Sequence, residues 1–231
     1  MSSAAPEEAS TVPASGEEAA RAQRVNVLAI VTVALHALGL ALAAIGMRPG
    51  TDLVPHAERM AYLASAPLGW SLGWGVWMLC AFSLVAFLFF VARATGDPPL
   101  QRLAMMLAVA GLGADLICDT IHIRVTPALA AANDPRLLIA LDALATTVGA
   151  VVANGLYSIA ILLVSACLWR RGATLVMQLG LAVFAFGMLM VVAGFDAVPS
   201  HLELATGPAI ALFSAWALAV ARFISRPVPR Q

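Results

Sequence analysis

Six long apolar runs make up most of this chain, and they constrain its fold more than any other feature. They cover residues 25–46, 68–92, 103–123, 137–168, 175–195 and 203–222. Each is close to or above the roughly 20 residues that a helix needs to cross the hydrocarbon core of a bilayer. With 61% hydrophobic and only 11% charged residues, the composition is not that of a soluble domain. We therefore predict an all-α membrane bundle of six transmembrane helices.

Little of the chain is left for water, so no separate soluble domain is expected. Residues 1–24 are rich in Ala, Ser, Pro and Glu, a composition typical of a flexible tail. Within them, the stretch GEEAARAQR could extend the first helix, because Glu17 and Arg21 have the i, i+4 spacing of a helical ion pair. We expect a cytoplasmic tail at 1–24, a transmembrane domain at 25–223 and a cytoplasmic stub at 224–231.

Arginine sets the expected orientation, since the chain has no lysine. With a cytoplasmic amino terminus, the inner side holds nine arginines: Arg21, Arg24, Arg93, Arg102, Arg170, Arg171, Arg222, Arg226 and Arg230. The outer side holds four: Arg48, Arg59, Arg124 and Arg136. This excess favours both termini in the cytoplasm. The alanine-rich and arginine-rich composition is typical of a GC-rich bacterial genome, and we expect a multi-pass protein of the bacterial inner membrane.

Several function classes are excluded or disfavoured. Without lysine the chain can form neither a retinal Schiff base nor a P-loop. Cys80, Cys118 and Cys167 lie on three different predicted helices without CxxC spacing, which favours small core residues over a redox or metal pair. The motifs GxSxG, HExxH and GxGxxG do not occur. These features favour a protein that is not an enzyme, and nothing points to direct nucleic-acid binding.

The third apolar run contains three ionisable residues, Asp115, Asp119 and His122, in the sequence GLGADLICDTIHI. Ionisable side chains within a membrane span are a functional hypothesis by default, because lipid cannot solvate them. Their spacing of four and three residues places all three on one helical face. At about 1.5 Å of rise per residue, His36 lies level with Asp115, and Asp142 lies level with Asp119. We predict that these five residues line a cup in the outer half of the bundle.

Three roles remain open for this cup. In the first, the residues are internal struts: His36 pairs with Asp115, and Asp119 shares a proton or water with Asp142. In the second, they bind zinc or a similar divalent ion that polarises a lipid carbonyl for hydrolysis. In the third, the cup receives a small molecule or lipid headgroup from the outer side. No arginine is expected at the depth of the three aspartates, and no cofactor is predicted, although the residue types suit a divalent metal.

The second apolar run begins with a glycine and tryptophan pattern, and an amphipathic segment precedes it. Gly69 and Gly73 form a GxxxG pattern, while Trp70, Trp74 and Trp77 form a stripe at i, i+4 and i+7. Such a stripe at the end of a span is typical of an aromatic belt and packing face. The preceding HAERMAYLASAP is amphipathic and could cover the cup as a lid, but the prediction favours an ordinary connecting loop.

Three segments carry a resemblance to known proteins: LGWSLGWGVWMLCAFSLVAFL, the Asp-bearing third run, and ANGLYSIAILLVSACLWRR. They resemble small six-helix inner-membrane proteins of bacteria. The overall architecture is also similar to the integral-membrane anti-sigma regulator of light-induced carotenoid synthesis in myxobacteria. This resemblance implies a regulatory or sensory protein that sequesters or releases a cytoplasmic partner, such as a sigma factor, in response to a signal. The alternatives are a metal-dependent lipid hydrolase and a small-solute transporter.

Overall fold

The chain folds into a bundle of helices. The computed structural model describes residues 16–95, 98–196 and 199–226, and these contain no β-strand. Six helical stretches among them are long and apolar enough to cross a membrane: Ala19–Gly50, Leu68–Thr95, Pro99–Ala131, Pro135–Trp169, Thr174–Phe195 and Leu204–Ile224. We number these stretches as spans one to six. They confirm the predicted all-α fold with six spans, of which the third extends farthest beyond its predicted end.

Three spans are continuous α-helices, and three change their helical type along their length. The continuous ones are α3 (Leu68–Thr95), α8 (Thr174–Asp196) and α9 (Pro199–Ile224). Span one consists of α1 (Gly16–Leu42), η1 (Ala43–Met47) and η2 (Arg48–Gly50). Span three consists of α4 (Pro98–Thr120), η3 (Ile121–Val125) and α5 (Thr126–Ala131); span four consists of α6 (Pro135–Thr146), η4 (Thr147–Ala153) and α7 (Asn154–Trp169). Segments η1, η3 and η4 are π-helical.

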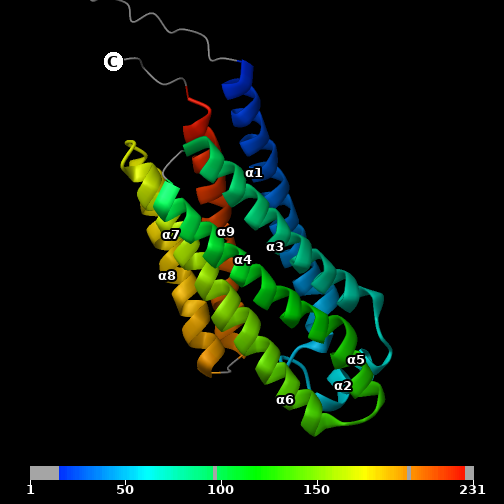
Figure 1. The fold of residues 1–231 in the computed structure, drawn as a ribbon. Helices are drawn as coiled ribbons and strands as arrows, with labels where there is room; N and C mark the ends of the chain where they lie inside the picture. The colour runs from blue at the N-terminus through cyan, green and yellow to red at the C-terminus, as the bar shows by residue number, and fades with distance from the viewer. Residues whose placement is uncertain (1–15, 96–97, 197–198, 227–231) are drawn as a thin grey trace, which may run out of the picture.

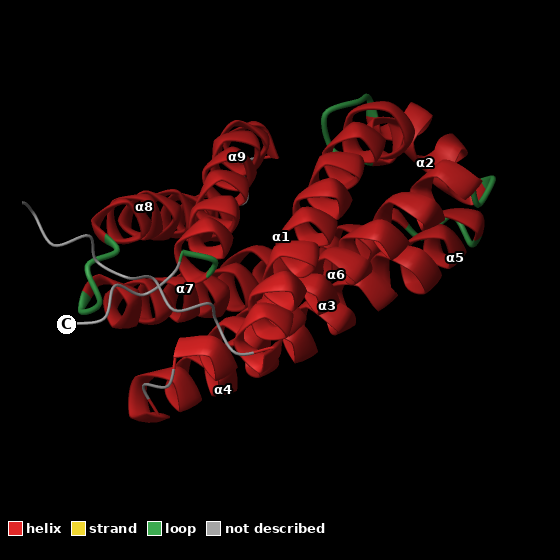
Figure 2. Ribbon diagram, turned by 90° about the horizontal axis from the view of Figure 1, so that it is seen from above, coloured by secondary structure: helices red, strands yellow, loops and turns green. Residues whose placement is uncertain are grey.

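The spans form a closed ring in the order of the sequence. Each span packs against the next, and α9 packs back against α1. The first and last described helices meet at one end of the bundle, where Asn26 Nδ2 donates to Ser225 Oγ at 2.8 Å (Figure 1). The short helix α2 (His56–Ala64) lies with α5 and the start of α6 at the opposite end (Figures 1 and 2). We call these the terminal end and the α2 end.

The terminal end is filled by a continuous apolar core. Buried side chains from every span contribute to it, including Val25, Val91, Ala108, Leu168, Val183 and Trp216. Trp216 Nε1 donates to Ser165 Oγ at 2.9 Å, and Ser165 Oγ in turn donates to the Ile161 carbonyl at 2.7 Å. The polar groups of this core are thus paired, which is what a low-dielectric interior requires.

The expected amino-terminal tail is helical over its last part. Helix α1 begins at Gly16, and Arg21 pairs with Glu17 at 3.1 Å, as the i, i+4 spacing predicts. Residues 1–15 of the expected tail and residues 227–231 of the stub lie outside the described residues. Spans four and five are joined by a tight turn at Gly172, whose φ of +88° suits a residue without a Cβ.

We expect Gly180→Ala to destabilise the protein by overpacking the contact between α7 and α8. A Cβ at Gly180 would lie 2.0 Å from Ser165 Oγ and 2.6 Å from Ser165 Cβ. Ser165 cannot rotate away without losing its bond with Trp216. Overpacking of this kind costs about 1–3 kcal/mol, and thermal unfolding in dodecyl maltoside should show a lower Tm than the wild type.

The matched control is Gly113→Ala in α4, where a Cβ meets nothing within 4 Å. Both variants gain the same intrinsic helix propensity from alanine. Gly113→Ala should therefore keep or slightly raise the Tm. Equal Tm values for the two variants would contradict the close packing at Gly180.

Candidate functional site

A cavity of about 690 Å³ lies within the bundle toward the α2 end. All five residues predicted from the sequence line it: His36, Asp115, Asp119, His122 and Asp142. Every span contributes to its wall, as shown by His36, Trp77, Asp119, Asp142, Val183 and Phe213. The volume falls within the range of about 300–1,000 Å³ that is usual for small-molecule sites. The structure thus brings the predicted residues together around one space, but not in the predicted pairs.

Asp115 and Asp119 lie one turn apart on α4. Asp115 Oδ2 accepts a hydrogen bond from the Tyr157 hydroxyl on α7 at 3.4 Å, which is a long bond. Asp119 is only 1% exposed, and its Oδ2 has no hydrogen-bond partner. The expected sharing of a proton between Asp119 and Asp142 does not form, because Asp142 pairs elsewhere. A buried carboxyl oxygen without a partner is costly, and Asp119 carries one on the cavity wall.

His36 also has a partner other than the predicted one. Its Nδ1 lies 2.8 Å from the carbonyl oxygen of Thr32, one turn earlier on α1. The imidazole packs against Phe213, with ring centroids 4.9 Å apart, and against the edge of Trp77 at 6.2 Å. The expected strut between His36 and Asp115 is therefore wrong, because the local carbonyl takes up Nδ1 and aromatic rings surround the rest of the imidazole.

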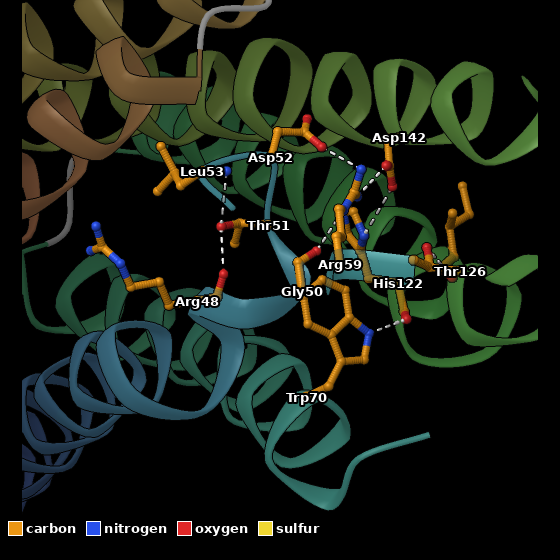
Figure 3. Close-up of polar contacts among 11 residues, drawn as sticks. Arg48, Gly50, Thr51, Asp52, Leu53, Arg59, Trp70, His122, Thr126 and Asp142 are labelled. Atoms are coloured by element: carbon orange, nitrogen blue, oxygen red, sulfur yellow. Dashed lines mark hydrogen bonds and ion pairs between the residues drawn. The ribbon is translucent and has the colours of Figure 1, made fainter. Parts of the chain in front are cut away.

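His122 lies in the π-helical segment η3, where two tryptophans of α3 hold it. Its ring stacks on Trp74 with a centroid separation of 3.9 Å and an interplanar angle of 11°. Its carbonyl accepts a hydrogen bond from Trp70 Nε1 at 2.6 Å (Figure 3). His122 Nδ1 lies 4.0 Å from Asp142 Oδ1, and neither atom has a hydrogen-bond partner. The tryptophan stripe thus acts as a packing face for His122.

Arg59 of α2 is the main residue that the sequence prediction missed. It is 4% exposed and forms ion pairs with Asp142 of α6 and with Asp52, while its Nε donates to the Gly50 carbonyl at 2.8 Å (Figure 3). The expectation that no arginine reaches the aspartates is wrong for Asp142. The spacing of Arg59 and Leu63 was an available signal, since residues four apart share a helical face, and both are buried.

The segment that contains Arg59 is a packed helix and not the expected connecting loop. Leu63 of α2 is fully buried in a second apolar cluster with Met47, Trp70, Ala130 and Leu138. Tyr62 donates its hydroxyl hydrogen to the Gly46 carbonyl. Burial raises the pKa of the Tyr62 hydroxyl, which donates this hydrogen bond. These contacts fix helix α2 across the end of the bundle.

All three π-helical segments border the cavity. Segment η1 contributes Met47, η3 contributes His122, and η4 contributes Gly149 and Ala150 to its lining. A π-helix has a wider turn than an α-helix and is often found at functional sites. Gly149 allows close contact here, because a Cβ on it would lie 2.7 Å from Cys118 Sγ. The wider turns therefore coincide with the place where the ring of spans is hollow.

The described His, Cys, Asp and Glu side chains do not converge on a metal centre. Within residues 16–95, 98–196 and 199–226, no three His, Cys, Asp or Glu side chains lie where they could hold one metal ion. Cys80 and Cys118 both line the cavity and are free thiols. Comparisons with protein-family models, with curated proteins and with solved structures find no match to this chain. Its function must therefore be inferred from the cavity itself.

We expect Arg59→Gln to lower the free energy of unfolding by about 3–5 kcal/mol, because it leaves buried charge on Asp142 without a partner. Asp52→Asn should cost no more than about 1 kcal/mol, since the Asp52 side chain is 52% exposed. Chemical unfolding in mixed micelles would measure both changes.

The double variant Arg59→Met with Asp142→Leu separates charge from packing. Replacing a buried ion pair by apolar side chains of similar size is often neutral, so this variant should recover most of the stability that Arg59→Gln loses. A double variant as unstable as Arg59→Gln would mean that the ion pair is not the source of the effect.

Proposed function

We propose that this chain is a sensory membrane protein whose cavity binds a small ligand and whose occupied state changes its hold on a cytoplasmic partner. The observation that carries this proposal is the unpartnered, buried carboxyl oxygen of Asp119 on a cavity of about 690 Å³. A bundle held only by internal struts has no need for such a space or for an unsatisfied group within it. A ligand that fills the space and pairs with Asp119 accounts for both.

A binding role is favoured over transport because the polar lining stops at the apolar core. Toward the terminal end the interior is filled by buried side chains such as Val91, Leu168 and Val220. A pathway for an ion or proton usually has ionisable groups at several depths. Lipid hydrolysis by a metal centre is disfavoured because the described donors do not converge on one ion.

A basic hollow at the terminal end suits contact with a partner at the opposite end from the cavity. A second hollow, of about 330 Å³, lies at the terminal end and is lined by Arg21, Arg24, Phe89, Phe90 and Arg93. Such a basic surface suits an acidic segment of a partner protein. Helix α1 reaches from His36 at the cavity to Arg24 near this hollow. In this proposal, ligand binding favours one of two helix packings and so alters the basic surface.

The proposal includes the sidedness expected from arginine. Eight of the nine arginines assigned to the inner side lie within the described residues, and each belongs to or adjoins the terminal end of a helix. By contrast, Arg48, Arg59, Arg124 and Arg136 belong to η2, α2, η3 and α6, toward the α2 end. We place the terminal end, and so both termini, in the cytoplasm and the cavity toward the outer side of a bacterial inner membrane. The architectural similarity to a membrane anti-sigma regulator makes a sigma factor the first partner to test.

We expect the wild-type chain, reconstituted in nanodiscs, to retain a cytosolic protein whose affinity depends on the cavity. Asp119→Asn removes the unpaired carboxylate and mimics one ligand state, so it should change that affinity by about fivefold or more. Replacing Arg24 and Arg93 together by glutamine should weaken capture and reduce its sensitivity to salt. Mass spectrometry would identify the retained protein, and titration would give its Kd.

The matched control is Asp134→Asn, because Asp134 caps α6 at an exposed site and asparagine caps equally well. It should bind the partner as the wild type does. If Asp119→Asn and Asp134→Asn give the same Kd, the cavity does not control the partner. If no protein is retained in a manner that depends on the arginines, the regulatory role is wrong.

A further inference from the structure

The wall of the cavity holds more acidic than basic side chains. Of the described residues on its wall, four are aspartates and two are arginines: Asp52, Asp115, Asp119, Asp142, Arg48 and Arg59. Arg59 is shared between Asp52 and Asp142. No ion pair joins Asp115 or Asp119 to a basic side chain within the described part of the chain. The two carboxyls on α4 thus form the acidic part of the wall.

These carboxyls retain acceptor atoms for a ligand. Asp119 Oδ2 is buried without a hydrogen-bond partner. Asp115 Oδ2 has only the long bond of 3.4 Å from the Tyr157 hydroxyl. A carboxylate can accept several hydrogen bonds, so both residues can receive a donor or a positive charge. An anionic occupant would be repelled by these carboxylates, and a neutral occupant could donate hydrogen bonds to them but would bring no opposite charge.

Aromatic rings also contribute to the wall of the cavity. Trp74, Trp77, Tyr157 and Phe213 all line the same cavity. The faces of such rings carry partial negative charge and attract organic cations, most strongly for tryptophan. Aromatic faces combined with carboxylates are the chemistry by which proteins recognise ammonium groups. The apolar residues beside them, such as Leu84 and Ile161, suit a hydrocarbon body.

We propose that the cavity binds an organic cation, an ammonium-type group with an apolar body, whose charge pairs with Asp115 and Asp119. This inference rests on the proposed function, which makes the cavity a ligand site, and adds the chemical class of the ligand. A small inorganic cation fits less well, because hard cations need six or more oxygen ligands in a close shell. A cavity of about 690 Å³ is much larger than such a shell.

The organic cation can come from two sources that share this chemistry. One is a membrane lipid with an ammonium headgroup, which would enter the cavity from the bilayer. The other is a free amphipathic cation. Competition separates them: phosphatidylethanolamine displaces a bound probe if the headgroup is the natural ligand, whereas phosphatidylglycerol, which lacks the ammonium, does not.

The test uses the full chain in dodecyl maltoside with two probes of nearly equal shape and opposite charge, tetraphenylphosphonium and tetraphenylborate. Isothermal titration, corrected for empty micelles, should show saturable binding of the phosphonium and none of the borate. Asp119→Asn and Asp115→Asn should each weaken phosphonium binding by at least about tenfold, because each removes one of the two carboxylates that would face the cation. Asp134→Asn should bind as the wild type does.

A second variant guards against loss of fold. Trp77→Leu keeps both carboxylates and should weaken the phosphonium by about threefold or more through the loss of an aromatic face. Gel filtration and the Tm confirm that each variant is folded. The phosphatidylethanolamine arm then assigns the source of the ligand.

The outcomes are distinct. Equal binding of both probes, or phosphonium binding that neither Asp119→Asn nor Asp115→Asn weakens, overturns the cation assignment. If the borate or a neutral copurified molecule binds instead, and Asp119→Asn changes its retention, the ligand class is wrong while the cavity remains a ligand site. If no compound is retained by the wild type and no lipid displaces another, both this inference and the proposed function fail.

Discussion

The Arg59 guanidinium is the contact on which the α2 end of the molecule depends. It joins helix α2 to Asp142 of α6, to Asp52 and to the Gly50 carbonyl, so that one side chain links three stretches of the chain. Because it pairs with Asp52 and Asp142, it leaves Asp115 and Asp119 without a basic partner. The packing of α2 and the lack of a basic partner for Asp115 and Asp119 are therefore linked through the same ion pairs.

The six spans could be predicted because lipid restricts composition strongly. A run of about 20 apolar residues has few other stable structures available, and the structure has a helix at each predicted run. The ends were harder to place. Span three continues through Thr126 and Pro127 to Ala131, since proline is tolerated in the first turn of a helix. Hydropathy falls in this region, although the helix does not end.

The members of the site could also be predicted, but their contacts could not. Rise per residue gives the depth of His36 or Asp142 within the bundle, and all five predicted residues line one cavity. Depth does not give rotation about the helix axis or the partner of each group. Arg59 and Asp142 are 83 positions apart, and no local pattern links them. Local carbonyls, such as that of Thr32 beside His36, also compete for side chains.

The π-helical segments make the cavity sensitive to chain length. A single extra residue converts an α-helical turn into a wider one, and each residue turns the helix by roughly 100°. Loss of one residue from η4 would thus restore an α-helix and rotate Asp142 relative to Tyr157, two groups on opposite sides of η4 that now line the same space. For this bundle, a one-residue deletion within a span is a larger change than most substitutions.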